Sequence, residues 1–159
     1  MLPLARSDFH IFLFEPEIPA NTGNIGRLCV ATGSCLHLIH PCRFLLTDKA
    51  LKRAGLDYWP DLSVVHHQSQ TEAFSQFAAD RVFLCSTKSE LSYLDVNYQP
   101  GDAFVFGPES RGLPATLLEQ YQGQVITIPM QPLCRSLNLA NSVAIILFEA
   151  IRQTSRIGI

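Results

Sequence analysis

Three polar segments of this chain bring charged, hydroxyl or amide side chains together, and the first two also contain glycine. They span residues 21–27 (Asn-Thr-Gly-Asn-Ile-Gly-Arg), 106–113 (Phe-Gly-Pro-Glu-Ser-Arg-Gly-Leu) and 128–142. The two later segments each follow a short apolar run that we predict to be a strand. Ligands of open α/β sheets bind at the carboxyl ends of strands. We therefore expect the two later segments to form one shared ligand site.

Each segment also has a reading that needs no ligand. Segment 21–27 could bring backbone N–H groups to an anion at a helix start, or it could be a capped helix entry with a solvated Arg27. Glu109 and Arg111 could contact a ligand or form an exposed ion pair on a tight turn. Ser136 fits the N-cap of the final helix, and that role is compatible with ligand binding. These residues alone leave the alternatives open.

Several familiar sites are disfavoured by what the chain lacks. It has neither the G-x-x-x-x-G-K-[ST] phosphate loop nor a G-x-G-x-x-G fingerprint after its first predicted strand. His66 and His67 are adjacent, and neighbouring residues of a strand point to opposite faces, so we predict no metal site. Cys85 and Cys134 have no histidine or helix start close in sequence to lower a thiol pKa. We therefore predict that both are apolar fillers rather than nucleophiles.

Length and composition predict one globular domain spanning residues 1–159. The chain is 47% hydrophobic and 16% charged, which excludes disorder. Its longest apolar run, Val143–Phe148, is far shorter than the ~20 residues of a membrane span. The first residues lack the build of a signal peptide, and the five cysteines show no C-x-x-C pair. We expect a cytoplasmic protein with reduced thiols. The net charge of −2 argues mildly against a dedicated nucleic-acid binder.

Apolar runs alternate with helical patterns along the chain, which predicts an α/β fold with a parallel sheet covered on both faces. The final helix is apolar nearly all round, so we expect it to be buried on a second side by another subunit. The expected strands are 9–14, 36–39, 62–65, 82–85, 104–106 and 125–128, and the expected helices are 24–32, 48–54, 71–79 (with Thr71 as N-cap), 114–120 and 137–154.

Four segments in this order resemble the SPOUT class of RNA methyltransferases, and more narrowly the small TrmL (YibK-like) tRNA ribose methyltransferases. The segments are 14–27, 53–58, 106–113 and 128–141, and the likeness covers nearly the whole chain. The resemblance implies a parallel sheet flanked by helices with a deep C-terminal trefoil knot, a rare feature among folds. It also implies a homodimer that binds S-adenosyl-L-methionine in the knot.

The activity implied by the resemblance is methyl transfer to the ribose 2′-hydroxyl of the wobble nucleotide, cytidine or modified uridine, of leucine tRNAs. Carried over by position, the cofactor-binding residues are Cys85, Ser86, Gly107, Ile128, Met130, Ser136 and Leu137. The catalytic residues are Arg27, from the partner subunit, with Asn21, Glu109 and Asn138. Because an arginine pKa lies above ~12, we expect Arg27 to stabilise phosphate and oxyanion charge rather than act as a base.

The tRNA surface is expected across the dimer, from Lys49, Lys52, Arg53 and the loop arginines. Two alternatives come from other functional classes. One is a knotted RNA-binding homodimer without catalysis, and the other is a nucleotide-binding α/β protein with no role in RNA. The presence of Arg27, Glu109, Ser136 and Asn138 favours the enzyme over the first alternative.

Overall fold

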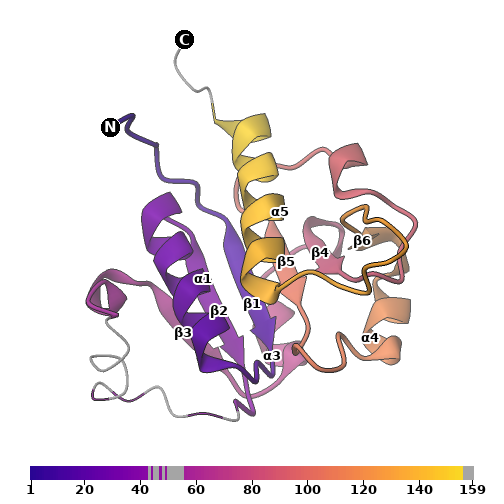
Figure 1. Cartoon of the computed structure of the whole chain (residues 1–159), viewed down its shortest axis with the longest axis horizontal. Helices are drawn as coiled ribbons and strands as arrows, with labels where there is room; N and C mark the ends of the chain where they lie inside the picture. The colour runs from indigo at the N-terminus through magenta and orange to yellow at the C-terminus, as the bar shows by residue number, and fades with distance from the viewer. Residues whose placement is uncertain (43, 45–46, 48, 50–55, 156–159) are drawn as a thin grey trace.

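The computed structural model describes residues 1–42, 44, 47, 49 and 56–155, and its centre is one parallel sheet (Figure 1). The sheet has six strands in the order β3-β2-β1-β5-β4-β6. Every pairing is parallel, which confirms the predicted fold class of a parallel sheet flanked by helices. The strands are β1 His10–Phe14, β2 Cys35–Ile39, β3 Val64–His67, β4 Val82–Cys85, β5 Ala103–Phe106 and β6 Val125–Ile126.

Helices cover both faces of the sheet. α1 (Pro19–Thr32) and α5 (Leu139–Thr154) pack on one face, while α3 (Gln70–Phe74) and α4 (Ala115–Gln120) pack on the other. Four short 3-10 helices, η1 Trp59–Asp61, η2 Ala79–Arg81, η3 Tyr93–Asp95 and η4 Gln122–Gln124, complete the described elements.

Alternate residues of the central strands belong to two hydrophobic cores, one on each face of the sheet. Ile11 and Leu13 of β1 pack beneath α1 and α5, whereas Phe12 and Phe14 pack towards α3 and α4. Successive residues of a strand point to opposite faces. A strand covered on both sides must therefore be apolar throughout, which is why these strands show as continuous apolar runs in the sequence.

Three helix boundaries differ from the sequence-based predictions. α1 begins at Pro19 rather than Asn24, because proline suits the first helical turn. The N-cap of α5 is Asn138 rather than Ser136, and its Oδ1 accepts a hydrogen bond from Asn141 N at 3.2 Å. α3 is capped by Ser69 rather than Thr71, and it ends at Phe74.

Two strands also differ. β3 covers Val64–His67 instead of 62–65, in register with β2. β6 is limited to Val125–Ile126, because the next backbone N–H, that of Thr127, donates to Leu91 O at 2.8 Å and not to β4. The helix expected over 48–54 lies outside the described residues, apart from Lys49.

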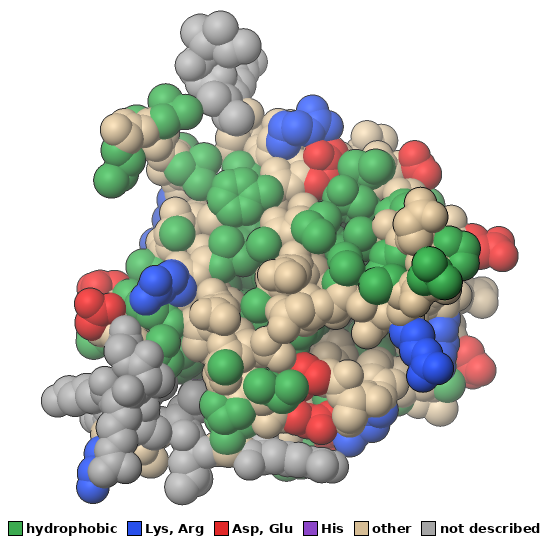
Figure 2. All heavy atoms as spheres, viewed as in Figure 1, with side chains coloured by type: hydrophobic (Ala, Val, Ile, Leu, Met, Phe, Trp, Pro, Cys, Tyr) green, Lys and Arg blue, Asp and Glu red, His purple; other side chains and the backbone are tan. Residues whose placement is uncertain are grey.

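Within one chain α5 is buried on one side only. Its fully buried side chains are those of Val143, Ile146, Leu147, Ala150 and Ile151, whereas Phe148 is 49% exposed. Figure 2 shows hydrophobic side chains gathered on the face that carries α5. Burial of a second side of α5 by another subunit stays a prediction. No helix in the described part of the chain combines the length and apolar character needed to cross a membrane.

Candidate functional site

A cavity of about 510 Å³ opens at the carboxyl ends of three neighbouring strands. The sheet order places β5, β4 and β6 side by side, so the segments that leave these strands meet at one edge. The walls come from residues 85–88 after β4, 106–113 after β5, residues within 126–130 after β6, and residues around the start of α5. The expected meeting of the two later polar segments at one cavity is therefore observed.

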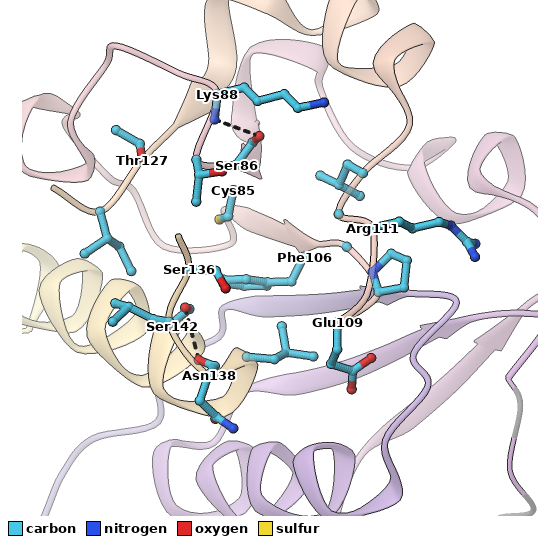
Figure 3. Close-up of a pocket in the computed structure, with 18 of the residues that line it drawn as sticks. Cys85, Ser86, Lys88, Phe106, Glu109, Arg111, Thr127, Ser136, Asn138 and Ser142 are labelled. Carbon is cyan, nitrogen blue, oxygen red and sulfur yellow. Dashed lines mark hydrogen bonds between the residues drawn. The ribbon is translucent and has the colours of Figure 1, made fainter. Parts of the chain in front are cut away.

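All seven residues predicted to bind the cofactor line this cavity. They are Cys85, Ser86, Gly107, Ile128, Met130, Ser136 and Leu137. In Figure 3, Cys85 and Ser86 lie on one wall and Ser136 faces them from the segment that leads into α5. The structure brings these residues together, and their role in binding stays a prediction.

Lys88 and Thr127 also line the cavity, although no motif pointed to them, and Ser142 lines it from the end of the 128–142 segment. Lys88 and Thr127 lie just beyond the ends of β4 and β6. Their position after a strand end, rather than any spacing of residue types, is the signal that could have found them. Ser142 lies in the first turn of α5, where its hydroxyl donates to the carbonyl of Asn138 at 3.2 Å.

Gly107 marks a point where two backbone segments touch. A Cβ atom there would lie 2.4 Å from both the carbonyl carbon of Gly112 and the nitrogen of Leu113. Those atoms are backbone and cannot swing aside, so only glycine fits. The two ends of the 106–113 loop therefore touch just beyond the end of β5, and this contact shapes one wall of the cavity.

The thiol of Cys85 lies against the cavity but is poorly suited to nucleophilic chemistry. Burial raises its pKa well above the ordinary value, because the thiolate would lose its hydration. The thiol therefore stays protonated at neutral pH and behaves as a small apolar group. This supports the prediction that Cys85 fills space beside a ligand.

Glu109 ties the 106–113 loop to the start of α1. One carboxylate oxygen accepts from Glu17 N at 2.9 Å, and the other accepts from Ile18 N at 3.1 Å and from Asn21 Nδ2 at 3.2 Å. The N-cap residue of α1, Ile18, offers no side-chain cap. A carboxylate close to a helix N-terminus is stabilising, so Glu109 provides the cap from a distant part of the chain.

The same network continues to α5. Asn138 Nδ2 donates to Asn21 Oδ1 at 3.0 Å, while the backbone of Asn138 begins α5. Asn21, Glu109 and Asn138 thus lie together and line the cavity (Figure 3 labels Glu109 and Asn138). The Glu109 carboxylate accepts three N–H hydrogen bonds. It therefore fixes the 106–113 loop against α1 and, through Asn21, against the start of α5.

The ion pair considered between Glu109 and Arg111 does not form. Arg111 instead pairs with Glu15, the residue that follows β1. The neighbouring Ser110 Oγ donates to Glu17 Oε1 at 2.6 Å. The polar residues of the 106–113 loop are therefore directed towards residues 15–21, and they give that loop a second anchor.

Arg27 is the predicted catalytic residue that does not line the cavity of its own chain. It lies exposed on α1, and its guanidinium carbon is 5.1 Å from the centroid of the Tyr58 ring. Residues 21–27 form helical backbone rather than a loop. Within one chain, the structure therefore does not bring Arg27 to the cavity with the other predicted catalytic residues.

His66 and His67 have different partners, as their alternation in a strand requires. His66 Nδ1 lies 2.7 Å from His40 Nε2, and His67 Nε2 lies 2.9 Å from His37 Nδ1. Among the described residues, the ligand atoms of His10, Cys35 and His37 lie within 4.8 Å of one another. That group is at the amino ends of β1 and β2, remote from the cavity, and two of its imidazoles are hydrogen-bonded to each other at 2.8 Å.

Comparison with known proteins places this geometry in a family. The SpoU rRNA methylase family matches residues 8–148. A tRNA (cytidine(34)-2′-O)-methyltransferase of Methylovorus glucosotrophus is 47% identical over 146 residues, covering 91% of this chain and 95% of that protein.

Two solved structures agree with this result. A candidate RNA methyltransferase from Bacillus anthracis is 43% identical with a TM-score of 0.86, covering 91% of this chain and 93% of that one. A structure concerned with 2-OH methylation of C/U34 on tRNA is 44% identical with a TM-score of 0.84, covering 91% and 95%.

Proposed function

Because the chain belongs to the SpoU rRNA methylase family, we propose that it transfers a methyl group from S-adenosyl-L-methionine to a ribose 2′-hydroxyl of tRNA. The target is the wobble nucleotide, and the relatives with this activity in their names act on cytidine 34. By resemblance, the acceptors are leucine tRNAs with cytidine or a modified uridine at that position, and the product is S-adenosyl-L-homocysteine. We place this activity in the cytoplasm and in a single domain of residues 1–159.

The observation that carries the proposal is the cavity at the ends of β4, β5 and β6. Its volume of about 510 Å³ suits a ligand the size of a nucleoside with an amino-acid arm. Its lining combines apolar side chains such as Ile128 and Ile146 with hydroxyls such as Ser86 and Ser136. That mixture fits an adenine ring held between apolar groups and a ribose held by polar ones. The C-terminal knot that accompanies such a pocket in the family is part of the proposal.

S-adenosyl-L-methionine, when bound, supplies a methyl group activated on a sulfonium. The chain's own contribution is to hold the cavity rigid, since transfer to a hydroxyl depends on an in-line approach. Glu109, Asn21 and Asn138 provide that rigidity by linking the 106–113 loop, α1 and α5. We therefore assign these three residues to shaping the site rather than to proton transfer, with the proton of the hydroxyl passing to water or phosphate.

We further propose that two chains form a homodimer in which Arg27 of one protomer serves the cavity of its partner. Arg27 lies outside the cavity of its own chain and exposed on α1. A shallow depression between α1 and α5 is lined by Asn24, Leu28, Asn138, Ala140, Asn141 and Ala144. Leu28, Ala140 and Ala144, together with exposed Phe148, offer apolar surface, and the asparagines offer hydrogen-bonding groups, a mixture that suits a self-complementary interface. The cationic Arg27 guanidinium would stabilise phosphate and developing oxyanion charge.

The tRNA surface would extend from this dimer. Lys49 is exposed, while Lys52 and Arg53 lie outside the described residues. Lys88 and Arg111 flank the cavity from the 85–88 and 106–113 segments (Figure 3). These cations would give a net-acidic chain a local basic footprint for the anticodon stem.

The proposal is tested by incubating the purified chain with bulk tRNA and methyl-labelled S-adenosyl-L-methionine. We expect the label to enter tRNA. One phosphodiester of the labelled tRNA should resist alkaline cleavage, because a methylated 2′-oxygen cannot attack the adjacent phosphate. Nuclease mapping should place the label at the wobble nucleotide. Cofactor binding without transfer to any tRNA would overturn the enzyme and favour a knotted RNA-binding dimer without catalysis.

A further inference from the structure

The Tyr58 side chain lies against one turn of α1, and the Arg27 guanidinium lies over its ring. Its ring centroid is 5.1 Å from the guanidinium carbon of Arg27, and its hydroxyl donates to the backbone carbonyl of Gly23. Gly23 and Arg27 are one helical turn apart on the same face of α1. The tyrosine side chain therefore bridges this turn, with its hydroxyl at one end and Arg27 over its ring.

Two glycines of α1 allow the segment that carries Tyr58 to pack closely against the helix. A Cβ atom on Gly26 would lie 3.0 Å from both the Trp59 ring and a methyl group of Leu62, and one on Gly23 would lie 3.2 Å from Leu56. These contacts are tighter than a side chain accepts without displacement of its neighbours. Residues 56–62 thus pack directly on the helix backbone, which explains the glycines of segment 21–27 by packing rather than by ligand binding.

We propose that Tyr58 is a positioning residue that fixes the Arg27 guanidinium in the orientation used for methyl transfer, and that Gly23 and Gly26 seat it there. This role rests on the proposed function of Arg27. It also gives a purpose to Tyr58 itself, since residues 56–58 do not line the cavity.

The choice of an aromatic ring has a chemical reason. In the described part of the chain, no acidic side chain forms an ion pair with Arg27. A carboxylate would hold the guanidinium but would occupy its N–H donors and neutralise its charge. A ring face and a phenol hydroxyl engage fewer of the guanidinium N–H donors than a carboxylate would, so donors remain for a phosphate or an oxyanion.

The phenol is held in the protonated form that this contact needs. Burial raises the pKa of Tyr58 above its ordinary value, while the nearby Arg27 charge opposes the rise. The ring therefore stays neutral at physiological pH, and its hydroxyl remains able to donate to the Gly23 carbonyl. The interaction with Arg27 is then of the cation–π kind.

The test compares Tyr58→Leu with Tyr58→Phe and Tyr58→Trp, each with and without Arg27→Ala. We expect Tyr58→Leu to lower kcat/KM for tRNA methylation roughly 3- to 30-fold, the range that corresponds to loss of a cation–π contact. The affinity for S-adenosyl-L-methionine should not change, because the proposal places Arg27 against the phosphate and ribose of the tRNA and not against the cofactor. Phe and Trp retain the ring face and should retain most of the rate. In the Arg27→Ala background, Tyr58→Leu should cause no further loss.

A second measurement does not depend on catalysis. The Nε–H signal of Arg27, assigned by its absence in Arg27→Ala, reports the order of the guanidinium by heteronuclear NMR relaxation. We expect this order to fall in Tyr58→Leu and to persist in Tyr58→Phe.

Three results would overturn the positioning role: equal losses for Leu and Phe, an undiminished loss in the Arg27→Ala background, or unchanged Arg27 order in Tyr58→Leu. A wild-type chain that binds cofactor but transfers no methyl, with Arg27 ordered by Tyr58 all the same, would instead overturn the proposed function.

Discussion

Asn138 Nδ2 lies 3.0 Å from Asn21 Oδ1, and this hydrogen bond joins the start of α5 to the first turns of α1 across 117 positions of sequence. Asn21 in turn donates to Glu109, so three segments that are distant in sequence meet in one polar network. The network borders the cavity. Its integrity should therefore influence both the stability of the fold and the affinity for the cofactor.

Replacing Asn138 tests both of its contacts. Asn138→Ala removes the α5 cap and the bond to Asn21, and we expect a loss of about 1 to 3 kcal/mol in the free energy of unfolding. Asn138→Ser keeps a capping oxygen but is too short to reach Asn21, so its loss should be smaller. Urea unfolding measures both, and titration calorimetry measures the accompanying loss of cofactor affinity. Equal stability of Ala and Ser variants would contradict a capping role.

Gly107→Ala should damage the cavity without touching a catalytic group. The added methyl would lie 2.4 Å from backbone atoms of Gly112 and Leu113, so the loop must open and move the cavity wall. We expect cofactor affinity to fall at least about tenfold, since small displacements of a binding site are costly. Gly123→Ala is the matched control, because no atom lies within 4 Å of its added methyl. Unchanged affinity in Gly107→Ala would refute the close-approach argument.

Mixing two impaired chains, at a cofactor concentration too low to fill the Gly107→Ala cavity, tests whether Arg27 acts across the dimer. Arg27→Ala lacks the arginine but has an intact cavity, while Gly107→Ala has the arginine but a damaged cavity. If the two chains exchange partners at random, half of the dimers carry both, and one site of each such dimer is complete. We therefore expect recovery to about a quarter of the wild-type rate.

Mixed chains that show no recovery, despite subunit exchange verified by differently tagged chains, would place Arg27 in the cavity of its own protomer. Each variant must also be shown to remain dimeric by light scattering. A stable monomer of the wild-type chain at micromolar concentration would remove the basis for a shared site.

Stability should fall on acidification because of a buried row of histidines. His37 is hydrogen-bonded to His10 at 2.8 Å and to His67 at 2.9 Å. Burial, then the neighbouring His10 and His67, lower the pKa of His37 from 6.5 to about 3. Between these two values the unfolded chain binds a proton that the folded chain does not, so unfolding becomes easier as pH falls from 6.5.

Each pH unit within that window corresponds to about 1.4 kcal/mol for one proton. We therefore expect His37 to account for a loss of about 2 kcal/mol between pH 6.5 and pH 5, measured by urea unfolding. His37→Phe keeps a ring against Phe12, whose ring is stacked on His37, but takes up no proton, so its pH dependence should be shallower. An unchanged slope in this variant would exclude His37 as the source. His40→Gln, in the separate His40–His66 pair, is the control.

The sequence was sufficient to predict the layers of the fold. Buried strands such as β1 and β5 must be apolar throughout, and this requirement is local enough to be read from residues 9–14 and 104–106. The two polar segments after predicted strands were enough to predict a shared cavity, because the ends of parallel strands share an edge. The boundaries of α1 and α5 were predicted less well, since the carboxylate that caps α1 comes from Glu109, far along the chain.

Tertiary structure alone decided what the polar residues do. Glu109 and Arg111 looked like an ion pair on a turn, yet each has its partner in residues 15–21. The glycines of α1 were compatible with a ligand loop. In the fold they allow residues 56–62, which include Tyr58, to pack closely against the helix backbone. Sequence patterns report which backbone conformation and which degree of burial a residue prefers. They do not report its partner, because hydrogen bonds and ring contacts depend on distances between segments that only the folded chain brings together.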